Sequence, residues 1–152
     1  MKIRILFLFV LQIYSIHFFA QKINLLNGID IIQNRHHVNV IKGYISVVDE
    51  RGLNDVLNKD YPVFVSEIPS NEFGDIEKFD FVQFDLLSSD FEVITSSNKE
   101  IQYQKGKYYS VISENDSKTG TFSFYRDKLM GIYSDKNGNN YNLGVLSNQT
   151  GK

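Results

Sequence analysis

The strongest constraint on the fold is the alternation of apolar and polar residues in the second half of the chain, which turn-forming residues interrupt at about ten-residue intervals. Residues 108–112, 120–125 and 129–133 are three such stretches. The pair Asn137-Gly138 suits a hairpin turn with positive φ, and residues 141–146 follow it. This succession predicts an antiparallel meander, so the expected fold class is mainly β, as a β-sandwich or an open barrel.

The first half of the chain holds one helical pattern among several strand-like stretches. Leu53, Val56 and Leu57 lie at helical spacing, which predicts one short helix within residues 51–60 that ends before Pro62. Longer strands are expected at residues 43–48, 63–68 and 79–86, and shorter ones at 91–95 and 101–103.

The alternation changes face within residues 79–86. Phe79 and Phe81 share one parity, whereas Val82 and Phe84 share the other. This change predicts a β-bulge at Phe81-Val82 or a strand that is buried on both faces. The meander also predicts one shared core for apolar residues of the later strands, namely Tyr108, Phe122, Phe124, Ile132 and Leu143.

The first twenty residues have the layout of a secretory signal peptide. Lys2 and Arg4 precede the apolar run 5–11, and Ala20 is the small residue before the expected cleavage. A membrane-spanning helix needs about 20 consecutive apolar residues, and Gln12 already interrupts this run. We therefore expect a secreted or periplasmic protein without membrane contact after cleavage, with an uncleaved amino-terminal anchor as the alternative.

The remaining chain is expected to form one β-rich domain at residues 21–147, followed by a polar tail at 148–152. Without Lys2 and Arg4, 14 of the 16 basic residues remain against 18 acidic ones, which gives a net charge of −4. A mildly acidic domain has no electrostatic reason to bind nucleic acid. The chain contains no Cys, so disulfide and thiolate chemistry are excluded and stability must come from packing.

Sequence motifs for the common kinds of catalysis and cofactor binding are absent. The chain has no His-Glu-x-x-His, no Gly-x-Ser-x-Gly, no glycine-rich phosphate loop and no calcium loop. Arg35-His36-His37 holds the only histidines outside the leader, and neighbouring residues of a strand point to opposite faces. With no Cys or further His to complete a zinc site, we expect no catalytic residue, no metal site and no cofactor.

Two further sets of residues have both a functional and a structural interpretation. Asn115 and Asn148 begin glycosylation sequons, but Asn and Ser also favour turns, and turn formation is the preferred interpretation. Six tyrosines could line an aromatic sugar-binding face, although half-buried strand positions explain them equally well and are preferred. These tyrosines are Tyr103, Tyr108, Tyr109, Tyr125, Tyr133 and Tyr141.

Several stretches between residues 60 and 147 follow a recurring order. They are residues 91–96, residues 105–110 with a Tyr-Tyr pair, residues 121–134 with a Gly-Ile pair, and residues 138–144 with Tyr-x-Leu-Gly. This order resembles the amino-terminal pro-domain of secreted bacterial reprolysin-like zinc metallopeptidases. The chain departs from that pattern at Ser110-Val111, where a glycine is expected, and it brings no zinc-binding helix.

The resemblance implies a non-catalytic role. Pro-domains of this kind assist the folding of a peptidase and cover its active-site cleft, so the expected partner is a zinc metallopeptidase domain, in cis or in trans. Inhibition by a thiolate is excluded, which leaves steric blocking, a carboxylate or an edge strand laid into the cleft. The chain would then be a fragment of a larger precursor or a free-standing copy.

Two alternatives remain open beside the pro-domain. The first is a free-standing extracytoplasmic β-sandwich that binds a protein or a polysaccharide. The second is an enzyme whose site no known motif reveals, which we disfavour because no titratable cluster supports it.

Overall fold

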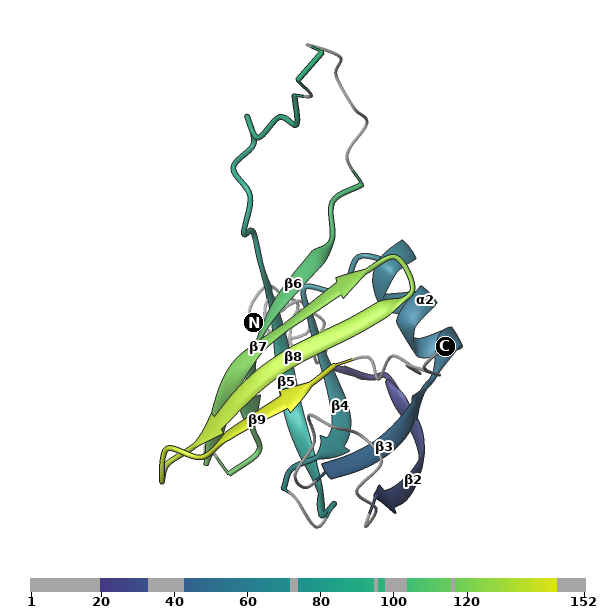
Figure 1. The fold of residues 1–152 in the computed structure, drawn as a ribbon, viewed down its shortest axis with the longest axis vertical. Helices are drawn as coiled ribbons and strands as arrows, with labels where there is room; N and C mark the ends of the chain where they lie inside the picture. Colours follow the sequence, from purple (N-terminus) through teal and green to yellow (C-terminus); the bar gives the residue numbers. More distant parts are fainter. Residues whose placement is uncertain are drawn as a thin grey trace, which may run out of the picture.

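A seven-stranded sheet forms the body of the protein, in the order β1-β4-β5-β6-β7-β8-β9 (Figure 1). The computed structural model describes residues 20–32, 43–71, 74–94, 96–97, 104–115 and 117–144. The strands of the sheet are β1 (Gln21–Lys22), β4 (Val63–Pro69), β5 (Ile76–Phe84), β6 (Lys107–Ser113), β7 (Lys118–Tyr125), β8 (Lys128–Asp135) and β9 (Asn140–Leu143).

The sheet is a meander with one parallel addition. From β4 to β9 each strand pairs antiparallel with the next, whereas β1 pairs parallel with β4 through Gln21↔Phe64 and Lys22↔Val65. β1 and β9 are its two edges, so the sheet does not close into a barrel. The mainly-β prediction is therefore confirmed, with a mixed sheet in place of a purely antiparallel one.

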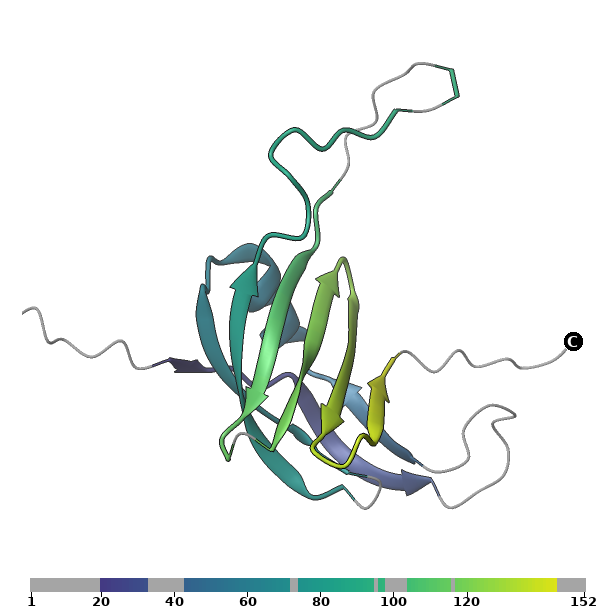
Figure 2. The ribbon, with the colours of Figure 1, turned by 90° about the vertical axis from the view of Figure 1, so that its left-hand side faces the viewer.

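A smaller layer covers one side of this sheet. β2 (Leu26–Ile32) and β3 (Gly43–Val48) form a separate two-stranded antiparallel sheet, and α2 (Glu50–Asn58) follows directly. Figure 2 shows α2 and the β2–β3 pair behind the large sheet. The core lies between these elements and the inner face of the sheet.

The single helix expected at residues 51–60 is present one residue earlier. Asp49 caps it, because its Oδ1 accepts hydrogen bonds from the backbone N–H groups of Arg51 (2.9 Å) and Gly52 (3.2 Å). Leu53 and Val56 are buried in the core, as their spacing indicates. Gly52 lies so close to the preceding segment that a Cβ would stand 1.7 Å from the Asn24 carbonyl oxygen.

Aromatic rings fill the core. Phe64 stacks on Phe81 with ring centroids 4.5 Å apart, and Tyr109 meets the edge of Phe124 at 5.3 Å. Such pairs add about 0.5–1.5 kcal/mol beyond the burial of their surface. The buried Tyr133 hydroxyl donates to the Pro69 carbonyl at 2.6 Å, so its polar group is satisfied.

The predicted core set is partly wrong. Phe122 and Phe124 are buried and Leu143 packs against the core, but Tyr108 and Ile132 lie on the opposite face of the sheet, where Ile132 is 46% exposed. The reason is strand parity: the inward residues of β6 and β8 include their neighbours Tyr109 and Tyr133.

The predicted bulge is also wrong. The pairs Phe81↔Val111 and Val82↔Ser110 follow each other without a register shift, and β5 is equally regular against β4. Val82 is 47% exposed, so β5 is not buried on both faces either. The apolar residues of the second parity instead face solvent.

Some of the remaining strand predictions are confirmed and others are wrong. Strands at 43–48, 63–68, 108–112, 120–125 and 129–133 are confirmed, and the Asn137-Gly138 turn has φ 82° at Gly138. Residues 91–94 form no strand, and Ile94 makes only an isolated β-bridge. Strands β1 and β2 were not predicted.

Several expectations fall on residues that the structure does not describe. These are the leader at residues 1–19, Arg35-His36-His37, residues 101–103, Asn148 and the tail at 148–152. Within the described part of the chain, no helix is long and apolar enough to cross a membrane.

Candidate functional site

The side of the large sheet turned away from the core, here called the outer face, is the first candidate. The strand registers place one central row across it: Val63, Val82, Ser110, Thr121, Ile132 and Asn142. The next row is Phe84, Tyr108, Ser123 and Met130. Neither row contains a charged residue, which is unusual for solvent-facing positions and typical of the centre of an interface.

The exposed apolar groups of the outer face come from four different strands. Val63, Val82, Met130 and Ile132 lie in its two uncharged rows, and each is more than two-fifths exposed. Ile112 adds to them from the adjacent row, in which Lys22 and Asp80 are the charged residues. Charged residues otherwise lie at the ends of the face, as Lys78 and Lys128 do.

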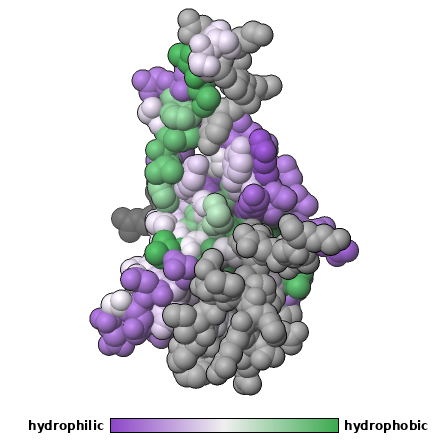
Figure 3. Space-filling view, viewed as in Figure 1, coloured by the Kyte–Doolittle hydropathy of each residue, from purple (hydrophilic) through white to green (hydrophobic). Residues whose placement is uncertain are grey.

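The second candidate is the long connection between β5 and β6, here called the arm, at residues 85–106. Its outgoing branch at residues 85–94 extends beyond the end of the sheet (Figures 1 and 2). Leu86 is 58% exposed and Ile94 is 63% exposed, and Phe91 is exposed as well. In the space-filling view, hydrophobic residues follow the outgoing branch of the arm (Figure 3). Loops longer than about 12–15 residues that lack secondary structure are commonly functional or disordered.

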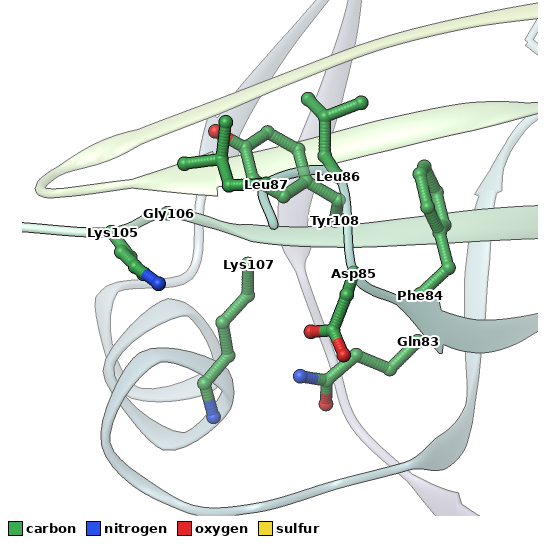
Figure 4. Close-up of a pocket in the computed structure, with 9 residues that line it drawn as sticks. All are labelled: Gln83, Phe84, Asp85, Leu86, Leu87, Lys105, Gly106, Lys107 and Tyr108. Carbon is green, nitrogen blue, oxygen red and sulfur yellow. The ribbon is translucent and has the colours of Figure 1, made fainter. Parts of the chain in front are cut away.

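The base of the arm continues the outer face. Phe84 and Tyr108 pair across β5 and β6 with ring centroids 6.3 Å apart. Figure 4 shows Leu86 and Leu87 on the same side of β6 as Tyr108, with Lys107 on the other side. The apolar surface therefore extends from the sheet to Leu86 and Leu87 at the base of the arm.

The hollow at this base is small. It measures about 60 Å³ and its lining includes Gln83, Asp85 and Lys107 (Figure 4). Pockets for small ligands measure about 300–1,000 Å³. The arm base is therefore a surface feature and not a small-molecule site.

A wider hollow of about 290 Å³ lies beside the start of α2, between Lys22, Asp49 and Arg51. Asp49 already occupies the amino end of the helix, and hydrogen bonds from the Asn27 amide and the Gly52 N–H hold the pKa of its carboxyl below the ordinary value. An anion would have to displace this carboxylate, so the hollow offers no anion site.

A polar cluster at the opposite end of the sheet has a structural role. Lys118 Nζ and Glu77 Oε2 form an ion pair at 2.5 Å, with both side chains 15% exposed. Burial acts to raise the pKa of Glu77, but the hydrogen bond and charge of Lys118 outweigh it, so the pKa lies below its ordinary value. Ser117 Oγ also donates to Glu77 at 3.3 Å, which ties the β6–β7 turn to β5.

Asn115 takes part in this turn through its side chain. Its Oδ1 accepts hydrogen bonds from the Ser113 hydroxyl (2.9 Å) and the Ser117 N–H (3.0 Å). Asn115 thus lies in a turn, as its residue type favours.

The six tyrosines do not form one sugar-binding face. Tyr109 and Tyr133 are buried, and Tyr141 stacks on Tyr133 at 5.1 Å on the inner side. Burial raises the pKa of Tyr109 to about 12. Only Tyr108 and Tyr125, among the described tyrosines of this set, lie on the outer side, which favours the interpretation as half-buried strand residues.

Metal chemistry finds no support in the residues that the structure describes, where no group of three or more His, Cys, Asp or Glu could hold an ion. Comparisons of the chain with protein-family models, with curated proteins and with solved structures found no match. The resemblance to metallopeptidase pro-domains therefore rests on the quoted sequence stretches alone.

The outer face and the arm were not singled out from the sequence, although a signal for both was present. Strand β5 carries apolar residues of both parities, and Met130 and Ile132 alternate with the inward Leu129 and Tyr133 in the same way. When only one face of a strand packs against the core, apolar residues on its other face indicate a second contact surface.

Proposed function

We propose that the chain is a non-catalytic, exported domain that binds a protein partner through its outer face. In line with the sequence resemblance, the partner would be a zinc metallopeptidase domain, in cis or in trans, which the chain assists in folding or blocks sterically. The observation that carries the proposal is the pair of uncharged rows on the outer face, with Val82 and Ile132 nearly half exposed at their centre.

A protein partner fits this surface better than a polysaccharide. Sugar-binding faces use flat aromatic rings, whereas the exposed groups here are mainly the aliphatic side chains of Val63, Val82 and Ile132. The Arg126 guanidinium lies 5.1 Å from the centroid of the Tyr125 ring and competes for that face. Aliphatic surface is instead what the buried centre of a protein interface requires.

The proposal also takes the fold as an open barrel, not as a β-sandwich. The inner face of the sheet is covered by α2, by the segment that carries Ile23 and Leu25, and by the two-stranded β2–β3 sheet, not by a second sheet of comparable size. The outer face then stays accessible for a partner. The amino-terminal leader would place that encounter in the periplasm or outside the cell.

The test combines the purified exported chain with a reprolysin-like peptidase from the same cell. Two rates are measured: cleavage of a peptide substrate, and recovery of peptidase activity during refolding. We expect the chain to slow the first or to speed the second. The double variant Val82→Lys/Ile132→Lys should lose the effect at least tenfold, because it places two charges at the centre of the interface.

The matched control is Val47→Lys. Val47 is a 66% exposed apolar residue of β3, outside the large sheet, so its substitution should change neither rate. A chain without effect on either rate contradicts the proposal, and so does a double variant that behaves like the wild type.

A further inference from the structure

We infer that β9 is the strand through which two copies of the chain pair, so that two seven-stranded sheets join into one. The inference goes beyond the proposed function, because it concerns an edge of the large sheet and leaves the outer face of each copy uncovered. Three features carry it: the chemistry of the two edges, the direction of the backbone groups of β9, and the match of β9 with a second copy of itself.

The two edges of the large sheet are protected to different degrees. At the first edge, Lys22 forms an ion pair with Glu67 at 2.7 Å and β4 ends at Pro69. Charges and proline discourage the addition of a further strand. At the other edge, residues 137–144 contain no charged residue and no proline, and β9 pairs with β8 without a register shift. Among the described strands, none pairs with the other side of β9, which forms the margin of the sheet (Figure 2).

The register of the β8–β9 hairpin shows which backbone groups of β9 point away from β8. The Asp135 N–H donates to the Asn139 carbonyl oxygen at 3.0 Å, so these two residues form a hydrogen-bonded pair. Hydrogen-bonded and non-hydrogen-bonded pairs alternate in an antiparallel ladder. The odd-numbered residues of β9 therefore direct their N–H and C=O groups toward β8, whereas Asn142 and the other even-numbered residues direct theirs to the open side.

A second copy of β9 matches this edge when it runs antiparallel and the two Asn142 residues lie on a two-fold axis. Asn142 then faces its own copy as a hydrogen-bonded pair, and Asn140 faces Gly144 of the second copy in the same way. Every outward backbone group of residues 140–144 gains a partner in this arrangement. A second copy thus supplies the parity that the edge requires, and it brings no charged residue opposite another.

The same pairing covers apolar surface on the inner side of the sheet. Tyr141 and Leu143 pack against the core but remain partly exposed, and Tyr141 stacks on Tyr133 at 5.1 Å. In the joined sheet, Tyr141 of each copy lies opposite Leu143 of the other, and apolar side chains in such cross-strand positions stabilise the pairing. The four residues of β9 form a contact smaller than that of a permanent dimer, so the association is reversible and depends on concentration.

Crosslinking of single thiols tests the register. The chain contains no Cys, so an introduced Cys is unique. In Asn142→Cys the two thiols of a dimer lie opposite each other, and a short bifunctional thiol reagent can bridge them. The matched control is Thr121→Cys, which is exposed on the outer face in β7, two strands away from β9. We expect covalent dimers of Asn142→Cys to form about ten times faster than those of the control, since residues opposite each other in a hydrogen-bonded pair have Cα atoms about 5.5 Å apart.

Sedimentation of the purified chain over a concentration series tests the backbone hydrogen bonds. Asn142→Pro removes an N–H group that β8 does not use, which an edge strand tolerates. Each dimer loses two hydrogen bonds, so the association constant should fall about tenfold or more. Asn142→Thr keeps the N–H group and should associate like the wild type. Circular dichroism and Tm values check that both variants remain folded.

Two lysine variants distinguish this edge from other surfaces. Val82→Lys places a charge on the outer face, and Val47→Lys places one on β3, which is also an uncharged strand. Neither substitution touches β9, so neither should change the association.

Four results overturn the inference. They are a wild-type chain that stays monomeric up to about 1 mM, crosslinking of Asn142→Cys no faster than that of the control, association that survives in folded Asn142→Pro, and association that is lost in either lysine variant. The proposed function is judged separately by the two peptidase rates, so either proposal can fail while the other stands.

Discussion

Removal of the arm should make the domain more stable. In the sheet, Phe84 pairs with Tyr108, so continuing the register by one residue brings Asp85 opposite Lys107. Residues 86–106 can therefore be replaced by Asn-Gly, which closes a two-residue hairpin. The loop becomes about tenfold shorter, and because closure entropy scales as (3/2)RT ln n, the gain is about 2 kcal/mol.

Urea unfolding measures this gain. The chain contains no Trp, so the transition is followed by tyrosine fluorescence and by far-UV circular dichroism. We expect a free energy of unfolding higher by about 2 kcal/mol and a Tm higher by roughly 6–10 °C. Leu86 and Ile94 contribute little to the folded state because they are exposed, so their loss should not offset the gain.

The control is an arm of the same length built from Gly and Ser. It keeps the closure entropy and removes the side chains, so its stability should stay near that of the wild type. If the shortened variant is less stable than the wild type, or if the Gly/Ser arm is strongly destabilised, the arm packs on the domain and the reasoning fails.

Three further predictions concern the core, the ion pair and the helix. Phe81→Ala should lower the free energy of unfolding by about 3–5 kcal/mol, whereas Val82→Ala, next to it but half exposed, should change it by about 0.5 kcal/mol or less; urea unfolding compares the two. The pKa of Glu77 is lowered in the folded state, so its stabilising contribution is present above pH 4.5 and is lost as the pH falls through the folded pKa; Glu77→Gln should flatten that acid-side loss in a pH series of Tm values. Gly52→Ala stabilises an ordinary helix by about 1 kcal/mol, but here the added methyl meets the Asn24 carbonyl at 1.7 Å, so thermal unfolding should show a lower Tm.

The meander could be predicted because the residue patterns that specify its strands and turns are local in the sequence. Turn-forming residues recur between short alternating stretches, and consecutive strands pair in chain order from β4 to β9. Which face of each strand turns toward the core is not determined by the local sequence in the same way. Tyr108 and Tyr109 are equally aromatic, so the pattern alone does not decide which one enters the core.

The position of a glycine can indicate which face of a strand turns toward the core. Gly131 lies on the inner parity of β8, and a Cβ there would stand 2.6 Å from the Phe122 ring. The ring fills the space that a side chain would need. A glycine between Met130 and Ile132 thus marks the inward positions, which identifies both neighbours as outward.

The amino-terminal strands and the conformation of the arm could not be predicted for a different reason. Residues 29–32 carry an Ile-Asp-Ile alternation, which would have supported β2. The parallel pairing of β1 with β4 covers two residue pairs and joins segments about 40 residues apart, so no local pattern reports it. Phe91 and Val93 have strand propensity, but among residues 91–94 only Ile94 makes a β-bridge, so propensity alone did not produce a strand there.

The order of the strands has a consequence for how the protein is made. From β4 onward each new strand adds to the one synthesised just before it, so the chain can build its sheet in the order of its synthesis, one hairpin at a time. No segment of the meander has to wait exposed for a distant partner. For a domain without Cys, which no disulfide can hold together during folding, this sequential assembly keeps its many Phe and Tyr side chains from meeting other unfolded chains.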